Sequence, residues 1–151
     1  MSNNTVEQKP SESASFAALR RAIAHKEFNN QNLGPDYLAE YFLDSPVPFL
    51  IKFKITRGMI KNRLDRFLPG LYEFVIARTA FFDRTFVDAL QEGIPQIVLL
   101  GAGYDSRAYR FASLNSATQI IELDIAPTQN KKKECLQKAN IDIQIRLPSS
   151  L

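Results

Sequence analysis

The sequence has 151 residues, of which 45% are hydrophobic and 23% charged, with a net charge of +3. This composition is typical of a globular domain rather than of a disordered or fibrous chain. One cysteine (Cys135) and one histidine (His25) exclude an internal disulfide and a Cys/His zinc site, so no metal is expected. No apolar run reaches the roughly 18 residues of a membrane helix, the N-terminus lacks a secretory core, and the lysine run 131–133 is typical of a solvated helix face. We therefore expect a cytoplasmic protein that binds neither membrane nor nucleic acid.

Helices are predicted for most of the first 70 residues. Residues 1–14 are polar and aperiodic and are expected to form a disordered tail, and a helix then runs from Ser15, a candidate N-cap, to about residue 28. Asp36 is expected to cap a short second helix that ends at the following prolines. Alternating lysine and apolar residues at 51–55 also suit a strand, but we favour a helix over 49–67.

The clearest amphipathic helix follows the Pro69–Gly70 turn and covers residues 71–91. Its apolar stripe is predicted to contain Leu71, Phe74, Val75, Phe82, Phe86 and Ala89. At about 100° per residue, Arg78 projects from the middle of this stripe. A cation there needs a partner, which could be the carboxylate of Asp83 or Asp105 or a bound ligand.

Two buried parallel strands are predicted after Gly93. The apolar run 97–100 is the first, and the run 119–124, which ends in acids, is the second. A glycine turn follows the first strand, residues 105–111 can open a helix, and Pro127 suits the first turn of a final helix that ends near Ala139. Residues 141–146 alternate as a third strand would.

This order of strand, glycine turn, helix and acid-ended strand is typical of a nucleotide-binding α/β fold. Gly101 and Gly103 allow a sharp turn and the close approach of a ligand, and the next helix offers free backbone N–H groups and a partial positive charge. Glu122 and Asp124 lie about 20 residues further on, where an acid accepts hydrogen bonds from ribose hydroxyls. For the glycine pair alone, a plain strand-to-helix turn is the alternative.

Two residues of the loop favour S-adenosylmethionine over NAD. A dinucleotide fold usually has a third glycine beneath the pyrophosphate, but position 106 is serine. The carboxylate of Asp105 would repel a pyrophosphate, whereas it could hold the cationic amino end of a methionine moiety.

The same loop resembles the signature of a known family. The run from Ile97 to Arg110, IVLLGAGYDSRAYR, is similar to the Leu-Gly-Ala-Gly-x-Asp-[Ser/Thr]-Arg-x-x-Arg block of leucine carboxyl methyltransferases. Three further blocks occur in the family's order over about residues 15–135: Arg21-Ala22 with Asp36-Tyr37-Leu38-Ala39, Ala77-Arg78-Thr79 with Phe82-Asp83, and Glu122-Leu123-Asp124 with Thr128-Gln129 and Lys132. The loop after the second strand departs from the pattern, because Pro127 stands one position later than the family's proline.

The resemblance implies an S-adenosylmethionine-dependent O-methyltransferase that acts on a carboxylate, either of a small molecule or of a protein C-terminus. It implies that Arg78 pairs with the methionine carboxylate of the cofactor and that the backbone of Gly101, in the turn shared with Gly103, borders the methionine end. It also implies that Asp124, with Glu122 beside it, engages the ribose. No catalytic base is expected, because an acceptor carboxylate is already ionised at neutral pH.

The expected fold is therefore α/β, with a helical N-terminal lid over residues 15–92 and the first part of a Rossmann-like, class I methyltransferase parallel sheet over 93–151. The chain is expected to be truncated, because family members are about twice as long and their later Asp-Leu pair has no counterpart here. An open sheet edge predicts self-association. The alternatives are a truncated, non-catalytic methyltransferase remnant and a fragment of an NAD-dependent oxidoreductase.

Overall fold

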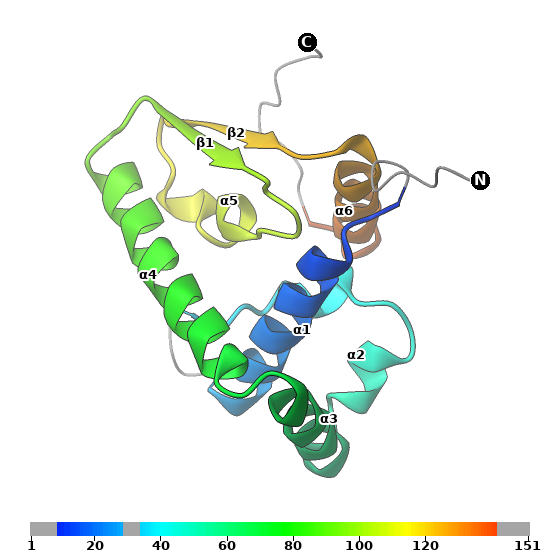
Figure 1. The fold of residues 1–151 in the computed structure, drawn as a ribbon. Coiled ribbons are helices and arrows are strands. Elements are labelled where there is room, and N and C mark those ends of the chain that lie inside the picture. The colour runs from blue at the N-terminus through cyan, green and yellow to red at the C-terminus, as the bar shows by residue number, and fades with distance from the viewer. Residues whose placement is uncertain (1–8, 29–33, 142–151) are drawn as a thin grey trace, which may run out of the picture. The chain divides into compact units, whose positions relative to one another are not determined.

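The computed structural model describes residues 9–28 and 34–141 and shows a mixed α/β chain (Figure 1). Its first half is helical, with α1 (Glu12–Glu27), the 3-10 helix η2 (Ala39–Phe42), α2 (Val47–Leu50), α3 (Lys54–Phe67) and α4 (Leu71–Gln91). The second half contains β1 (Gln96–Leu100), α5 (Arg107–Arg110), the 3-10 helix η3 (Ala112–Leu114), β2 (Gln119–Leu123) and α6 (Ala126–Lys138). Within these described ranges, no helix is long and apolar enough to cross a membrane.

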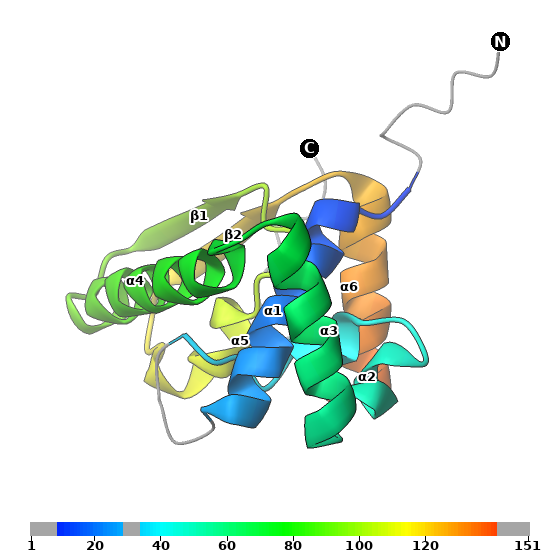
Figure 2. The ribbon, with the colours of Figure 1, turned by 60° about the horizontal axis from the view of Figure 1, so that its bottom comes forward.

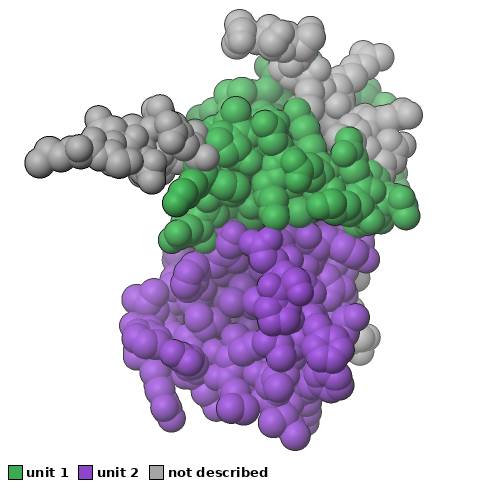
Figure 3. Space-filling model, turned by 90° about the vertical axis from the view of Figure 1, so that its right-hand side faces the viewer, with its two compact units in different colours: residues 1–14, 86–151 green, residues 15–85 purple. Residues whose placement is uncertain are grey.

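The chain divides into two compact units (Figure 3). Unit 1 contains residues 1–14 and 86–151, and unit 2 contains residues 15–85. The sheet and the glycine turn belong to unit 1, whereas the helices α2 and α3 belong to unit 2. The predicted third strand lies outside the described residues, except for its first residue, Ile141.

Unit 1 is built on a parallel pair of strands in which Gln96 lies opposite Gln119 and Leu100 opposite Leu123. Figures 1 and 2 show α5 on one side of this pair. On that side, the buried residues Phe86, Leu90, Ala108 and Ile120 form a core against which Ile97 and Leu99 pack. The predicted parallel strands are therefore present, and one face of the pair is packed against this core.

The prediction that both strands are fully buried is wrong. Val98, Leu100 and Leu123 are 45%, 78% and 45% exposed, and burial alternates along β1. The described residues cover one face of the sheet only, so every second apolar side chain of β1 contacts solvent. A continuous apolar run does not reveal which of its two faces is covered, and the predicted self-association through an open edge stays a prediction.

The helix α1 begins at Glu12, three residues earlier than predicted. Its N-cap is Ser11 rather than Ser15, because the Ser11 hydroxyl accepts a hydrogen bond from the Ala14 N–H at 3.2 Å. The Ser11 N–H in turn donates to Thr128 Oγ1 of α6 at 3.0 Å. These two hydrogen bonds of Ser11 position the start of α1, and the aperiodic sequence before it does not predict them.

The single helix predicted for residues 49–67 is two helices, α2 and α3, separated at residues 51–53. Phe53 has an extended backbone with ψ of 131°. Side chains of α3 satisfy the carbonyl groups that this break leaves at the end of α2, since the Thr56 hydroxyl donates to Leu50 O and the Arg57 guanidinium donates to Ile51 O at 3.0 Å. The helical prediction for α3 is confirmed, and the strand alternative for this segment is not observed.

The bounds predicted for α4 are confirmed, but its predicted apolar stripe is correct only in part: Val75 and Phe86 are buried, whereas the other predicted members are not. The buried positions are Tyr72, Val75, Thr79, Asp83, Phe86 and Leu90, at steps of three or four residues. Phe74 and Phe82 are 59% and 44% exposed. Two polar residues occupy the buried face because their groups are satisfied: Thr79 donates to Val75 O at 2.7 Å, and Asp83 accepts from the Gly34 N–H at 3.0 Å.

Candidate functional site

The turn after β1 depends on two glycines with left-handed backbone conformations. Gly101 has φ of 60° and Gly103 has φ of 49°, a region that side chains rarely tolerate. A β-carbon on Gly103 would lie 3.1 Å from the β-carbon of Ala14. A β-carbon on Gly101 would meet no atom of the described residues within 4 Å. Gly103 is therefore required by packing inside unit 1, whereas the space beside the exposed Gly101 is open to a ligand.

Backbone hydrogen bonds join this glycine loop to the end of β2. The Ala102 N–H donates to Leu123 O at 3.0 Å, and the Asp105 N–H closes the turn by donating to Ala102 O at 2.7 Å. The Gly103 N–H donates to Asp124 Oδ2 at 2.6 Å. The carboxyl ends of the two parallel strands thus lie together, as they do where nucleotide-binding α/β sheets hold their ligands.

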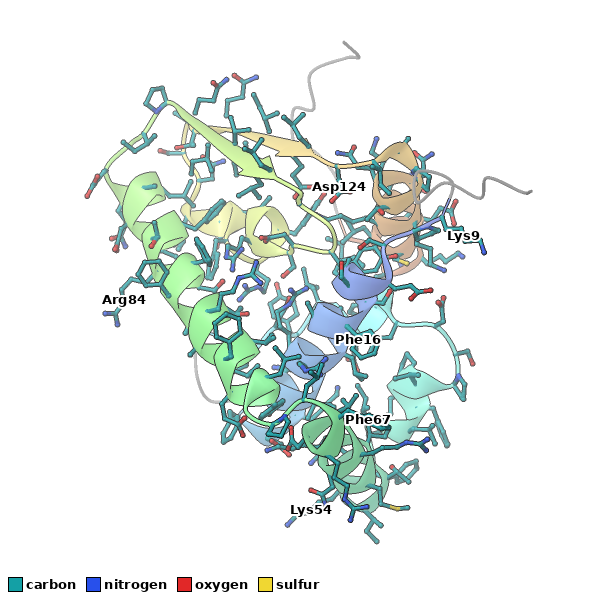
Figure 4. All side chains as sticks on the ribbon, in the orientation of Figure 1. Lys9, Phe16, Lys54, Phe67, Arg84 and Asp124 are labelled. Atoms are coloured by element: carbon teal, nitrogen blue, oxygen red, sulfur yellow. The ribbon has the colours of Figure 1, made fainter. Side chains whose placement is uncertain are left out.

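Asp124 follows the last residue of β2 and is half-buried (Figure 4). Its Oδ2 accepts the Gly103 N–H, and its Oδ1 accepts the Ile125 N–H at 2.7 Å. Each oxygen of a carboxylate has two acceptor sites, so each can accept one further hydrogen bond. The side chain is consequently held in place beside the loop and retains the capacity to bind a diol.

Glu122 is buried and has a cation of its own. Both of its carboxylate oxygens lie 2.8 Å from Nζ of Lys132 on α6, and the exposed fractions of Glu122 and Lys132 are 7% and 2%. Burial raises the pKa of the Glu122 carboxyl above its ordinary value, although Lys132 acts in the opposite direction. The Lys132 ammonium also lies 5.4 Å from the centre of the Tyr109 ring. The ion pair joins β2 to α6. Of the two predicted ribose ligands, Glu122 is thus occupied by Lys132, whereas Asp124 accepts hydrogen bonds from backbone N–H groups.

The residues that follow the loop differ from the prediction in two respects. The Asp105 carboxylate, which could hold an amino group, forms an ion pair with the Arg107 guanidinium and accepts the Arg107 N–H at 2.9 Å. The predicted helix over 105–111 is the four-residue α5, so the partial positive charge at its start is that of a single turn. The loop therefore offers a ligand its backbone and Asp124 rather than a long helix dipole.

Arg78 belongs to unit 2, whereas Gly101, Gly103, Glu122 and Asp124 all belong to unit 1. The prediction that Arg78 lies within a buried apolar stripe is wrong, because the residue is exposed and its guanidinium lies 5.8 Å from the centre of the Phe82 ring. No carboxylate among the described residues of unit 2 pairs with Arg78, which leaves the predicted alternative of an ion pair with Asp83 unformed. Its guanidinium is accessible to an anionic ligand.

Sequence reasoning missed the internal partners of the site. Lys132 was part of a family motif, but nothing in its lysine-rich surroundings indicated that it is buried against Glu122. Ser106, noted only as the residue in place of a third glycine, is buried and accepts a hydrogen bond from Arg110 Nε at 2.9 Å. No group of three or more His, Cys, Asp or Glu side chains within residues 9–28 and 34–141 could hold a metal ion.

The chain has recognisable relatives. The family model of leucine carboxyl methyltransferases matches residues 14–148. A protein of Mycobacterium avium (strain 104) is 32% identical over 117 residues, which cover 74% of this chain and 36% of that protein. A protein of Mycolicibacterium paratuberculosis is 44% identical over 57 residues, which cover 38% of this chain and 18% of that protein. Both carry the name of an S-adenosyl-L-methionine-dependent methyltransferase. The chain spans about a third or less of the length of these relatives, and it belongs to the leucine carboxyl methyltransferase family.

Proposed function

We propose that this chain supplies the S-adenosyl-L-methionine site of a methyltransferase. The observation that carries the proposal is the junction of the glycine loop with Asp124, where the carboxylate is fixed by two backbone N–H groups beside the open backbone of Gly101. This arrangement fits an adenosine ribose on Asp124 and a methionine moiety against Gly101. Membership of the family and the names of the relatives support the same cofactor.

Arg78 is proposed to bind the methionine carboxylate. Its guanidinium is exposed and has no carboxylate partner within the described part of unit 2, and a planar guanidinium suits a carboxylate in two parallel hydrogen bonds. Because Arg78 does not pair with Asp83, the cation is available without breaking an internal ion pair. Glu122 is assigned a supporting part, since its pair with Lys132 fixes the end of β2 from which Asp124 extends.

The reaction that we propose is O-methylation of a carboxylate. S-Adenosyl-L-methionine, when bound, supplies an electrophilic methyl group on a sulfonium sulfur. An ionised carboxylate attacks without losing a proton, so the protein has to contribute alignment and exclusion of water rather than a general base. In this proposal the chain's own residues bind and orient: Asp124 accepts the ribose hydroxyls, Gly101 permits close approach, and Arg78 holds the far end of the cofactor.

Binding of an NAD-type dinucleotide is the competing function. Ser106 replaces the third glycine of the dinucleotide fingerprint and is buried, so the loop lacks the residue that lets the helix pack closely on the sheet beneath a pyrophosphate. The four residues of α5 offer a pyrophosphate little helix dipole. The family match also supports a methyltransferase rather than an oxidoreductase.

Calorimetric titration of the full chain with S-adenosylhomocysteine and with NAD tests the proposal. We expect saturable binding of S-adenosylhomocysteine and no heat of binding for NAD. Binding of NAD without a response to S-adenosylhomocysteine would overturn the assignment. Transfer of a labelled methyl group from S-adenosyl-L-methionine to a carboxylate, read as an ester that mild alkali hydrolyses, tests the reaction separately from cofactor binding.

A further inference from the structure

The first turn of α1 lies against the proposed cofactor site. Residues 11–14, which we call the N-terminal strap, belong to unit 1 together with the glycine loop, β2 and α6. Figure 2 shows the start of α1 beside the start of α6. The strap contacts both of the segments that meet at Asp124, namely the first turn of α6 and the glycine loop.

A hydrogen bond fixes the strap to α6. The Ser11 N–H donates to Thr128 Oγ1 at 3.0 Å, and Thr128 is fully buried. Ser11 is the N-cap of α1, and the N–H of an N-cap residue has no acceptor within its own helix, so the Thr128 hydroxyl supplies one. Thr128 lies in the first turn of α6, four residues after Asp124. The strap is therefore joined to the segment that directly follows this carboxylate.

The other end of the strap contacts the glycine loop. A β-carbon placed on Gly103 would lie 3.1 Å from the β-carbon of Ala14 and 3.9 Å from Asp124 Oδ2. The Gly103 N–H donates to that same oxygen at 2.6 Å. The Ala14 N–H donates to the Ser11 hydroxyl at 3.2 Å, which closes the strap into a turn. A shift of Ala14 away from the loop would thus remove a packing contact beside the hydrogen bond that holds the carboxylate.

These contacts form a closed ring around the carboxylate, whose members are Thr128, Ser11, Ala14, Gly103 and Asp124. The chain from Asp124 to Thr128 completes it. A carboxylate that is already held in its binding orientation loses less conformational freedom when a ligand arrives, and the ligand binds more tightly for that reason. Each contact of the ring is therefore expected to contribute to affinity at Asp124.

We propose that Thr128 is a positioning residue of the S-adenosyl-L-methionine site and acts through the N-terminal strap. Its hydroxyl holds Ser11, and Ser11 orders the turn that places Ala14 against the loop beside Asp124. Because Thr128 is fully buried, it acts on the ligand only through these contacts. The inference rests on the proposed function, since it assigns a further residue to that same site. The coupling is reciprocal, so a ligand that binds better with the strap in place also holds the strap in place.

Calorimetry with S-adenosylhomocysteine on the full chain and its Thr128→Val and Thr128→Ser variants tests this proposal. Valine resembles threonine in shape but accepts no hydrogen bond, whereas serine keeps the hydroxyl. We expect Thr128→Val to weaken binding about fivefold, the effect of one ordinary hydrogen bond, and Thr128→Ser to stay within about twofold of the wild type. Thr118→Val, which replaces a buried threonine at the opposite end of β2, is the control and should leave the affinity unchanged.

Amide hydrogen exchange measures the reciprocal effect and needs no variant. At saturating S-adenosylhomocysteine, we expect the amide hydrogens of Ser11 and Ala14 to exchange at least about fivefold more slowly than in the free chain, because both effects express one coupling free energy. The amide hydrogen of Lys52, in a turn of unit 2, is the control for general stabilisation and should exchange at an unchanged rate. If Thr128→Val fails to fold, the exchange rates decide.

Several results would contradict the proposal. Wild-type affinity in a folded Thr128→Val variant would show that the strap does not position Asp124. An equal loss in Thr128→Ser would assign the effect to the buried methyl group, and an equal loss in Thr118→Val would assign it to general destabilisation of unit 1. Unchanged exchange at Ser11 and Ala14 would show that no coupling exists. Failure of the wild type to bind S-adenosylhomocysteine would instead refute the proposed function, and this inference with it.

Discussion

Replacing Lys132 with methionine is expected to destabilise the folded chain mainly through Glu122. Both side chains are buried, and the ammonium lies 2.8 Å from each carboxylate oxygen, so the methionine variant leaves a buried carboxylate without its cation. Removing one partner of a buried ion pair costs about 3–5 kcal/mol, whereas replacing both partners is often nearly neutral. Lys132→Met should therefore be strongly destabilising, and Lys132→Met combined with Glu122→Gln should recover most of the loss.

The cost should depend on pH, with a sign that follows from Glu122. Burial already raises the pKa of this carboxyl above its ordinary value of 4.5, and loss of Lys132 removes the group that opposes the rise. An acid with a raised pKa in the folded state keeps its proton longer there than in the unfolded chain, so its contribution to stability is present below about pH 4.5 and is lost as the pH rises. Each pH unit is worth about 1.36 kcal/mol. The cost of losing Lys132 should therefore approach the range of about 3–5 kcal/mol at pH 7.5 and be smaller at pH 5.5.

Urea denaturation of the wild type, Lys132→Met and the double variant at these two pH values measures the effect. We expect the free energy of unfolding of Lys132→Met to fall further below that of the wild type at pH 7.5 than at pH 5.5, because the variant lacks the cation that opposes the raised pKa of Glu122. A pH-independent loss would refute the argument that an unpaired Glu122 carboxylate causes it. So would a double variant no more stable than Lys132→Met alone.

Three further predictions test the site and the start of α1. Arg78→Gln should change the free energy of unfolding by less than about 0.5 kcal/mol, because the side chain is exposed, but it should weaken S-adenosylhomocysteine binding at least about tenfold. Arg84→Gln on the same helix should alter neither quantity. Equal affinities of the Arg78→Gln variant and the wild type in calorimetry would remove Arg78 from the site. Gly101→Ala should lower the free energy of unfolding in a urea titration by about 1 kcal/mol, because of its positive φ alone. Gly103→Ala should lower it further, because the added β-carbon would also lie 3.1 Å from the β-carbon of Ala14. The reverse order of the two losses would contradict the loop geometry. Ser11→Ala should lower stability by about 1 kcal/mol through loss of the N-cap, and an unchanged melting temperature would place the cap elsewhere.

Much of the fold could be predicted because periodicity and turn residues act locally. The bounds of α4 and the positions of the two strands follow from the patterns of residues 71–91, 97–100 and 119–124, and Pro127 alone marks the first turn of α6. Local patterns of this kind predict where a helix or strand begins and ends, whatever other element packs against it. The glycine loop was predictable for the same reason, since positive φ values favour glycine wherever they occur.

The incorrect predictions concern which face of an element is buried. Phe74 and Phe82 were assigned to the core of α4 because they are apolar, yet Thr79 and Asp83 are buried instead, since their polar groups find backbone partners distant in sequence or one turn away. The ion pair of Glu122 was missed for a similar reason, because it joins residues on a strand and a helix whose separation the sequence does not state. Sequence pattern identifies the elements, whereas contacts with the rest of the fold decide which face of each element is buried.

We propose that Asp124 and the glycine loop bind the adenosine part of S-adenosyl-L-methionine. The most direct test is the affinity of the full chain and of its Asp124→Asn variant for S-adenosylhomocysteine, measured by calorimetry with Asp88→Asn as the control for loss of an acid elsewhere in unit 1. Asparagine keeps one acceptor oxygen for a backbone N–H but cannot accept two ribose hydroxyls as a carboxylate does. We predict affinity at least about tenfold weaker for Asp124→Asn and unchanged for Asp88→Asn. Equal affinity in all three proteins would contradict the claim.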